Sequence, residues 1–441
     1  MTDHIYSRPA KSSWLAPTIQ HAISGSVSLP GSKSLTNREL VLSALATSPT
    51  HLRNPLESRD SSLMIESLIK LGTQINVSER SDILIVSPTT DIDSGAPLNA
   101  RIDCGLAGTV MRFVPPMAAL FAGVITFDGD EAARRRPMRT TIESLRALGV
   151  SVEDHGTGSL PFTINSSGVI EGGYLEIDAS ASSQFVSGLL LAAPRFTKGL
   201  SLRHVGKDLP SLPHIEMTLE CLRQRGVKVS QPEETHWVVE PGPINGGEVS
   251  IEPDLSNAGP FLAAALVLGG SVTIRNWPET TTQVGKHFVE ILTQMGASYS
   301  RSGDDLVITG TGTIKGIDID LSIGGELAPV VIALAVLANS SSRITGIAHL
   351  RGHETDRLAA LTNEINSIGG KATELEDGIA IEPSNELHGG TWGTYEDHRM
   401  ATAGAIIGLR VPGITIEDVS VVSKTMPEFV SLWTDLLGTN S

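Results

Sequence analysis

Residues 65–72 read IESLIKLG, an apolar helix pattern that closes on a glycine. Apolar residues three or four apart form one helix face, and a glycine directly after them is typical of a helix C-terminus. The same phrase ends at six glycines: Gly72, Gly149, Gly226, Gly296, Gly369 and Gly438. Their successive spacings are 77, 77, 70, 73 and 69 residues. This recurrence predicts a chain built from six similar units.

A second phrase precedes each of these helices, in which small or polar residues open an Ala- and Leu-rich helix. Its copies are PGSKSLTNRELVLSALA, CGLAGTVMRFVPPMAALFA, ASSQFVSGLLLAAP, LSNAGPFLAAALVLGG, GGELAPVVIALAVLA and EDHRMATAGAIIGL. β-branched stretches such as VITF, LSLRHV and ITIEDV follow and are typical of strands. Helices that are apolar on most sides are buried. The fold class is therefore α/β, with helices packed inside the sheets.

Two domains of three units each are predicted, because 441 residues exceed one ordinary core. The stretch PGPINGGEVSIEPD, residues 241–254, separates the third unit from the fourth and is rich in Gly and Pro. We expect a hinge at residues 241–253. The N-terminal domain is then residues 28–240, and the other domain contains residues 254–441.

Composition excludes several classes of protein. The chain is 40% hydrophobic and 19% charged, and has neither a membrane-length apolar run nor an apolar stretch of signal-peptide type at its start. We therefore expect no membrane association and a cytoplasmic location. The net charge of −16 argues against a nucleic-acid partner. Cys104 and Cys221 are far apart, which predicts neither a disulfide framework nor a cysteine metal site.

Charged and polar side chains gather at the turns that open the apolar helices. Lysines and arginines there have the wrong sign for the helix dipole and cost stability unless an anion binds. If the units are related by rotation, these turns meet in one place and present free N–H groups to an anion. The turns carry Lys33, Ser34, Arg38, Gly108, Thr109, Ser182, Ser183, Gln184, Glu326, Asp397, His398 and Arg399. The strand ends add Arg136, Ser211, His353, Glu354, Arg357 and Lys424.

Three interpretations compete for RGHETDRL, residues 351–358. A zinc helix would read H-E-x-x-H, but Arg357 stands four residues after His353, so we predict no metal site. A solvated helix start with Asp356 as its cap would be the default for a lone segment. The other anion-site residues favour the third interpretation, in which His353, Glu354 and Arg357 serve one cleft. The run Arg134–Arg136 also leaves two interpretations open. For Arg134 and Arg135, a solvated surface position and a place in the anion site are equally consistent with the sequence.

These motifs, in this order, resemble the 5-enolpyruvylshikimate-3-phosphate (EPSP) synthase family. The resemblance runs from LPGSKSLTNR through GLAGTVMR, RRRPM, SASSQF, HETDRL and YEDHRM to SKTMPEF, over nearly the whole chain. It implies two domains, each of three βαβαββ repeats with inward-packed helices, an inside-out α/β barrel. It also implies that residues 1–27 join residues 254–441, and that the domains close over the substrates.

The resemblance implies transfer of the enolpyruvyl group of phosphoenolpyruvate to the 5-hydroxyl of shikimate 3-phosphate, with phosphate released, in aromatic amino-acid biosynthesis. It implies no cofactor, and we expect a monomer. The implied catalytic residues are Glu326 as base and Glu354 as acid, with Lys33 or His398 relaying a proton. The shikimate 3-phosphate residues would be Lys33, Ser34, Arg38, Ser182, Ser183, Ser211, Glu326 and His353. The phosphoenolpyruvate residues would be Lys33, Gly108, Arg136, Gln184, Arg357, Arg399 and Lys424, with Thr109, Asp397 and His398 as further candidates.

The chain departs from the family's best-known pattern at Leu106, His214, Glu326 and His353, where Asn, Tyr, Asp and Lys are usual. Glutamate keeps the carboxylate of the base on a longer arm, and histidine keeps a donor without a fixed charge. Gly108 is the glycine that the family associates with sensitivity to the inhibitor glyphosate. These departures change contacts rather than the reaction.

Two alternative functions stay open at this stage. The first is enolpyruvyl transfer to UDP-N-acetylglucosamine, whose enzymes carry a cysteine in the loop that here reads DGDEAARRRPM, where no cysteine occurs. The second is a non-catalytic or RNA-end-binding relative of the fold. The acidic charge balance and the carboxylates of Glu326 and Glu354 argue against this second alternative.

Overall fold

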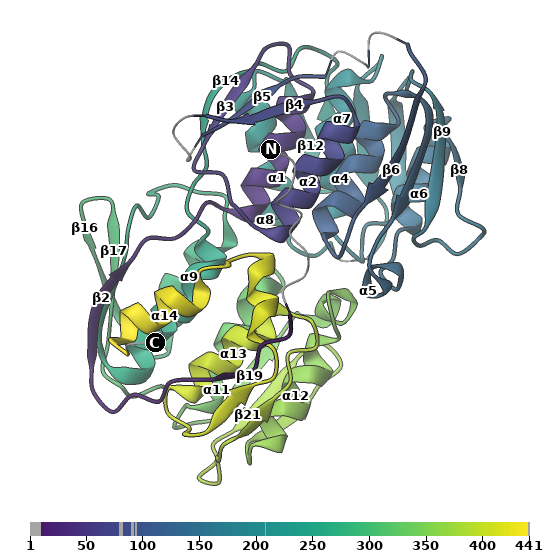
Figure 1. Cartoon of the computed structure of the whole chain (residues 1–441). Helices are drawn as coiled ribbons and strands as arrows, with labels where there is room; N and C mark the ends of the chain where they lie inside the picture. The colour runs from purple at the N-terminus through teal and green to yellow at the C-terminus, as the bar shows by residue number, and fades with distance from the viewer. Residues whose placement is uncertain (1–9, 79–82, 90–91, 93–94, 208, 440–441) are drawn as a thin grey trace. The chain divides into compact units, whose positions relative to one another are not determined.

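The computed structural model describes residues 10–78, 83–89, 92, 95–207 and 209–439. They divide into two compact units (Figure 1). The N-terminal unit is Gly31–Glu252, and the C-terminal unit contains residues up to Pro30 together with those from Pro253 onward. The hinge at residues 241–253 stays a prediction, and this segment includes a strand, β14 (Gly247–Ser250).

Three four-stranded sheets form the strand layer of the N-terminal unit, and they share one topology. In each sheet a parallel pair of strands is extended by two antiparallel strands. In two of the sheets a βαβ crossover makes the parallel pair. The first sheet takes its outer strand, β14, from the end of the unit, where β14 pairs in parallel with β3. The other strands are β3 (Thr50–Arg53), β4 (Gln74–Val77), β5 (Ile83–Ser87), β6 (Leu98–Asp103), β7 (Ala122–Asp128), β8 (Ser151–Glu153), β9 (Phe162–Ser167), β10 (Gly173–Ile177), β11 (Leu200–His204), β12 (Val229–Glu233) and β13 (His236–Val239).

The helices of the N-terminal unit gather in its middle, with the strands toward the outside (Figure 1). Helices α1 (Lys33–Ala44), α4 (Gly108–Ala118) and α7 (Gln184–Ala192) contact one another, and every residue of α4 is buried. Burial on all sides explains why α4 and α7 are largely apolar. The remaining helices are α2 (Arg59–Lys70), α5 (Glu131–Arg134), α6 (Arg139–Ala147) and α8 (Leu212–Gln224).

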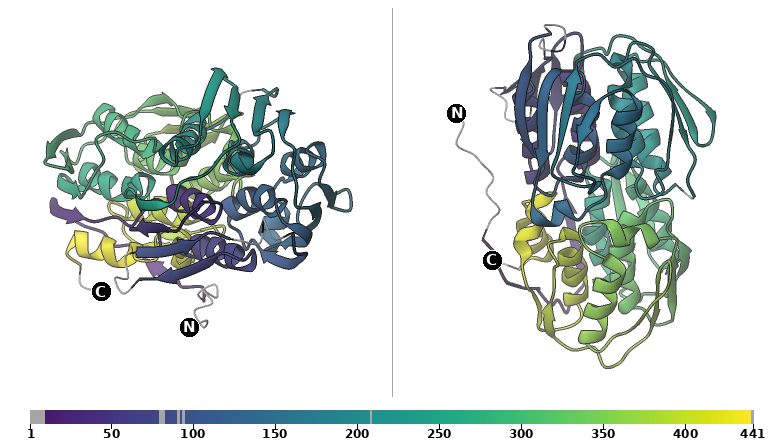
Figure 2. Two further views of the ribbon diagram at one scale, coloured as in Figure 1. Left: turned by 90° about the horizontal axis from the view of Figure 1, so that it is seen from above. Right: turned by 90° about the vertical axis from the view of Figure 1, so that its right-hand side faces the viewer.

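The C-terminal unit repeats this plan with strands from both ends of the chain. Strand β2 (Ile23–Val27) pairs in parallel with β15, and β1 (Trp14–Leu15) pairs antiparallel with β23. Figure 2 shows the purple strand β2 beside the yellow helix α14 (Phe429–Leu437), which it contacts. In the described part of the chain the sixth repeat ends at α14. In its sheet, β1 is the strand that pairs antiparallel with β23. The other strands are β15 (Gly270–Ile274), β16 (Ser298–Ser302), β17 (Asp305–Gly310), β18 (Asp318–Asp320), β19 (Ser342–Thr345), β20 (Lys371–Glu374), β21 (Ile379–Glu382), β22 (Gly390–Trp392) and β23 (Ile414–Ile416).

Three inner helices again form the core of the C-terminal unit. Helices α9 (Leu255–Leu268), α11 (Ala328–Val336) and α13 (His398–Gly408) contact one another and are buried along their whole length. The outer helices are α10 (Phe288–Gln294), α12 (Arg357–Ser367) and α14. The predicted α/β class with inward-packed helices is therefore confirmed.

All six glycines of the repeated phrase lie directly after or close to a helix end and have positive φ, between 66° and 114°. A residue with positive φ at this position satisfies the last helical carbonyls, and glycine adopts it without a Cβ clash. The phrase that revealed the repeat is thus the stop signal of helices α2, α6, α8, α10, α12 and α14. In the described part of the chain, no helix has the length and apolar character to cross a membrane.

Candidate functional site

Helix N-termini carry the predicted site residues of the N-terminal unit. Lys33 is the first residue of α1, Gly108 of α4 and Gln184 of α7. Ser32 caps α1 by accepting a hydrogen bond from the Leu35 backbone N–H. The inward packing of these three helices brings their first turns close to one another within this unit.

Gly108, Arg136 and Gln184 converge on one point. A Cβ on Gly108 would lie 3.0 Å from Gln184 Oε1 and 3.1 Å from Arg136 Nη2. It would also lie 3.2 Å from Nη1 of Arg112, a residue that the sequence analysis missed. Arg112 is one helical turn after Gly108 in α4, so this i, i+4 spacing could have indicated it. The absence of a side chain at Gly108 leaves the three polar groups close to the backbone.

The arginine run divides into two surface residues and one buried residue. Arg134 donates to both carboxylate oxygens of Asp128 at 2.8 and 2.9 Å, and Arg135 pairs with Glu131. Arg136 is only 8% exposed and donates from Nη1 to the Leu106 carbonyl at 3.2 Å. Among the described residues no carboxylate forms an ion pair with Arg136. A buried guanidinium in this state favours a bound anion.

Arg38 is held by hydrogen bonds to both α1 and α8. It is 1% exposed and donates to the Thr218 hydroxyl, to the Ser34 carbonyl and to the His214 carbonyl, each at 2.8 Å. Its guanidinium also lies over the Phe113 ring. These bonds join the start of α1 to α8, and one of them fixes the backbone of Ser34.

The other polar residues of this unit surround the same helix starts. Lys33 pairs with the buried Asp60 of α2 at 3.6 Å, a partner that sequence reasoning missed because Asp60 also fits an ordinary first-turn acid. Asn37 donates to the Thr109 hydroxyl at 2.7 Å. Ser182 accepts from the Gln184 N–H at 3.2 Å. Two further residues lie at helix N-cap positions: Ser183 of α7 and Ser211 of α8.

In the C-terminal unit two cations bind Glu354. Lys424 Nζ donates to Oε1 at 2.6 Å, and Arg357 Nη2 donates to Oε2 at 3.0 Å. All three side chains are at most 8% exposed. His353 Nδ1 lies 3.8 Å from the same carboxylate. An acid and two cations therefore share one buried position.

Asp397 contacts both Arg357 and Arg399. Its carboxylate accepts from Arg357 at 2.7 and 3.2 Å and from the Arg399 backbone N–H at 2.8 Å, which caps α13. Arg399 donates from Nη1 to the Ser256 carbonyl at 2.9 Å, and burial lowers its pKa. Arg357 keeps a raised pKa despite burial, because Asp397 and Glu354 stabilise its charge. His398 Nδ1 is 3.6 Å from Asp397.

Glu326 lies before helix α11, in the short 3-10 turn Gly325–Leu327. Its Oε1 accepts from the Ser256 hydroxyl at 2.9 Å. His349 packs beside it, because a Cβ on Gly325 would come within 2.4 Å of His349 Nε2. Burial and the charge of Arg357 lower the pKa of His349 to about 4, so this imidazole is neutral near pH 7. The sequence analysis missed His349 and Ser256, which belong to no charged motif.

The structure resolves the segment RGHETDRL. Asp356 caps α12 by accepting from the Ala359 N–H at 3.1 Å, which confirms its predicted role. The three-residue spacing of Glu354 and Arg357 predicts a shared helix face. This prediction is wrong, because α12 begins at Arg357 and Glu354 lies in the preceding turn. The turn nevertheless brings His353, Glu354 and Arg357 together.

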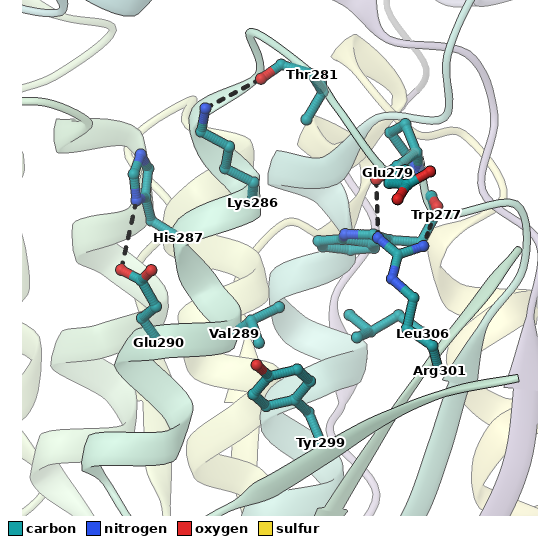
Figure 3. Close-up of a pocket in the computed structure, with 11 residues that line it drawn as sticks. Trp277, Glu279, Thr281, Lys286, His287, Val289, Glu290, Tyr299, Arg301 and Leu306 are labelled. Carbon is teal, nitrogen blue, oxygen red and sulfur yellow. Dashed lines mark hydrogen bonds and ion pairs between the residues drawn. The ribbon is translucent and has the colours of Figure 1, made fainter.

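A groove in the C-terminal unit contains charged residues but none of the predicted site residues (Figure 3). Lys286 donates to the Thr281 carbonyl at 3.1 Å, and Arg301 donates to the Trp277 carbonyl at 2.9 Å. His287 lies 3.8 Å from Glu290. Backbone carbonyls accept from both permanent cations of this groove.

Comparison with known proteins defines first a class and then a family. The fold matches the enolpyruvyl transferase NikO from Streptomyces tendae with a TM-score of 0.72 at 14% identity, over 97% of this chain and 98% of that one. It matches EPSP synthase from Acinetobacter baumannii with a TM-score of 0.78 at 25% identity, over 96% and 98% of the two chains. The fold is thus that of the enolpyruvyl transferases.

The family follows from sequence. The family model for EPSP synthase (3-phosphoshikimate 1-carboxyvinyltransferase) matches residues 17–433. A 3-phosphoshikimate 1-carboxyvinyltransferase from Kocuria rhizophila is 53% identical over 446 aligned positions, which cover 99% of each protein. The chain belongs to the EPSP synthase family, and the resemblance predicted from its motifs is confirmed.

Proposed function

We propose that this chain transfers the enolpyruvyl group of phosphoenolpyruvate to the 5-hydroxyl of shikimate 3-phosphate and releases phosphate. The observation that carries the proposal is Glu354 held by Arg357 and Lys424, an acid beside two cations in a member of this family. Protonation of a methylene carbon needs the acid, and the phosphate and carboxylate of phosphoenolpyruvate need the cations.

In this proposal each unit contributes residues that bind phosphoenolpyruvate. In the N-terminal unit Lys33, Gly108, Arg136 and Gln184 serve this substrate, supported by the convergence of the last three around the Gly108 backbone. In the C-terminal unit Arg357, Arg399 and Lys424 do so, with Asp397 orienting both arginines and His398 beside it. Thr109 supports the start of α4 through Asn37.

Hydroxyls at helix starts serve the sugar-like substrate. The residues proposed for shikimate 3-phosphate are Lys33, Ser34, Arg38, Ser182, Ser183 and Ser211 of the N-terminal unit and Glu326 and His353 of the C-terminal unit. The bonds from Arg38 to the Ser34 and His214 carbonyls also join the starts of α1 and α8. Hydroxyl and backbone N–H donors at such termini suit a phosphate.

Glu326 acts as the base that takes the proton of the 5-hydroxyl, and Glu354 as the acid. Without substrate, Glu354 accepts from both Arg357 and Lys424. A bound substrate anion competes with this carboxylate for the same two cations. Lys33 and His398 remain the proposed relays. No cofactor takes part in this scheme.

A monomer in the cytoplasm, without a nucleic-acid partner, completes the proposal. The net charge of −16 supports the lack of a nucleic-acid partner. Light scattering of the purified chain measures the oligomeric state, and fractionation of producing cells measures the location.

Acceptor choice tests the function directly. Phosphate release from phosphoenolpyruvate is measured with shikimate 3-phosphate, with UDP-N-acetylglucosamine and without an acceptor. We expect release only with shikimate 3-phosphate. Release with the UDP-sugar would support that alternative, and RNA-end binding without release would support the non-catalytic one.

A further inference from the structure

The turn before helix α13 carries backbone strain. The Thr394 carbonyl accepts from the Asp397 N–H at 2.8 Å, and the two central residues, Tyr395 and Glu396, have φ of 51° and 60°. A turn with positive φ at both central positions favours Asn and Gly. Tyrosine and glutamate pay a steric cost there through Cβ, so contacts outside the turn must offset it.

Glu364 of helix α12 supplies such contacts. Its Oε1 accepts from the Tyr395 hydroxyl at 2.7 Å, and its Oε2 accepts from the Gly393 N–H at 2.8 Å. The Glu364 residue is 9% exposed. A Cβ on Gly393 would lie 2.9 Å from Oε1, so the glycine permits this close approach. One carboxylate therefore holds both the entry and the first central residue of the turn.

The strained turn ends at Asp397, which orients the arginines of the C-terminal unit. Asp397 accepts from Arg357 and caps the helix that carries Arg399. Arg357 and Glu364 are seven residues apart in α12 and therefore lie on the same helix face. Helix α12 thus binds the turn at two points, through Asp397 and through Tyr395.

We propose that Glu364 is a positioning residue for Asp397 and, through it, for Arg357 and Arg399. The inference rests on the proposed function, in which these arginines bind phosphoenolpyruvate. Glu364 acts through the geometry of the turn. Its loss therefore weakens binding of phosphoenolpyruvate more than binding of shikimate 3-phosphate.

Two conservative variants of the full chain test this role. Glu364→Gln replaces one of the two acceptor oxygens by a donor, and Tyr395→Phe removes only the hydroxyl. We expect the KM for phosphoenolpyruvate to rise about tenfold, as for one lost hydrogen bond to a charged group, while the KM for shikimate 3-phosphate changes less than about twofold. Tyr174→Phe is the matched control, because it removes an exposed Tyr–Glu hydrogen bond in the N-terminal unit.

Relief of the strain gives an independent test. Glycine adopts positive φ without a Cβ clash, so Glu396→Gly makes the turn less dependent on Glu364. In the Glu396→Gly background, Glu364→Gln should raise the KM for phosphoenolpyruvate less than about threefold. A residue that only stabilises the fold would show no such selective rescue.

The outcomes separate this inference from the proposed function. An inactive wild-type chain would contradict the proposed function itself. With an active wild type, an unchanged KM for phosphoenolpyruvate in both variants, an equal rise for both substrates, or no rescue by Glu396→Gly would overturn the role of Glu364. Should Glu364→Gln fail to fold, Tyr395→Phe decides, because it keeps the ring and the turn.

Discussion

Arg357 binds Asp397 through two hydrogen bonds, from Nε to Oδ2 at 2.7 Å and from Nη2 to Oδ1 at 3.2 Å. The two residues are 40 positions apart, at the N-termini of α12 and α13. A bond between two helix starts fixes the direction of both. The positions of Arg357 and Arg399, the arginines proposed to bind phosphoenolpyruvate, therefore depend on how α12 and α13 pack.

Arg357→Ala should therefore damage both folding and binding. It leaves Asp397 and Glu354 buried without their shared cation, which costs roughly 3–5 kcal/mol of unfolding free energy. We expect a lower denaturation midpoint and a strongly raised KM for phosphoenolpyruvate. Arg351→Ala is the control, since its partners Asp356 and Glu374 are partly exposed and the loss should be about 0–1 kcal/mol. Equal effects of the two substitutions would contradict the central place of Arg357.

The arginine run allows a comparison within three residues. Arg136→Ala should raise the KM for phosphoenolpyruvate by at least about tenfold, because a buried charge-assisted contact is lost. Arg134→Ala breaks a pair between a half-exposed arginine and the buried Asp128, away from Gly108 and Gln184, and should leave both KM values nearly unchanged. If steady-state kinetics gave equally small effects for both, Arg136 would be only a structural residue.

His349 gives a prediction about pH. Burial and the charge of Arg357 lower its pKa in the folded chain from the ordinary 6.5 to about 4. The unfolded chain therefore binds the proton more readily between pH 6.5 and 4, and stability falls as pH falls through this window, by an amount on the order of a few kcal/mol. His349→Gln removes this titration, so the difference between variant and wild type in urea unfolding should change across the window. A constant difference from pH 7 to pH 4 would contradict the shift.

Glu354→Gln tests the acid. We expect kcat to fall at least about 100-fold, the low end for a lost general acid, while both KM values change little. Glu376→Gln, at an exposed position, is the control for the same chemical change. A near-normal kcat in Glu354→Gln would assign the proton transfer to another group.

Sequence alone predicted the repeat, because its signals are local. A glycine at positive φ is a common way to end a helix, so Gly72 and its five counterparts can be recognised along the sequence as the ends of successive units. A helix that is buried on all sides is apolar on all sides, which is also visible in the sequence. The grouping of Gly108, Arg136 and Gln184 was implied by the family resemblance, and the structure places the three residues close together in the N-terminal unit.

Contacts that depend on packing between helices could not be predicted in this way. Glu364, His349 and Asp60 stand in ordinary helical or loop contexts, and only the three-dimensional arrangement brings them to the helix starts. The same reason explains why the sequence did not predict that Arg38 is buried or that α12 begins at Arg357. Charge in a motif indicates a site, but not which charge faces the ligand.

Direct observation of the product tests the central claim. The purified chain is incubated with phosphoenolpyruvate and shikimate 3-phosphate, and the mixture is followed by proton and phosphorus nuclear magnetic resonance. We expect equal amounts of inorganic phosphate and of a new enolpyruvyl ether at the 5-oxygen, with the 3-phosphate intact. Phosphate without the ether, or an ether formed only with UDP-N-acetylglucosamine, would contradict this claim.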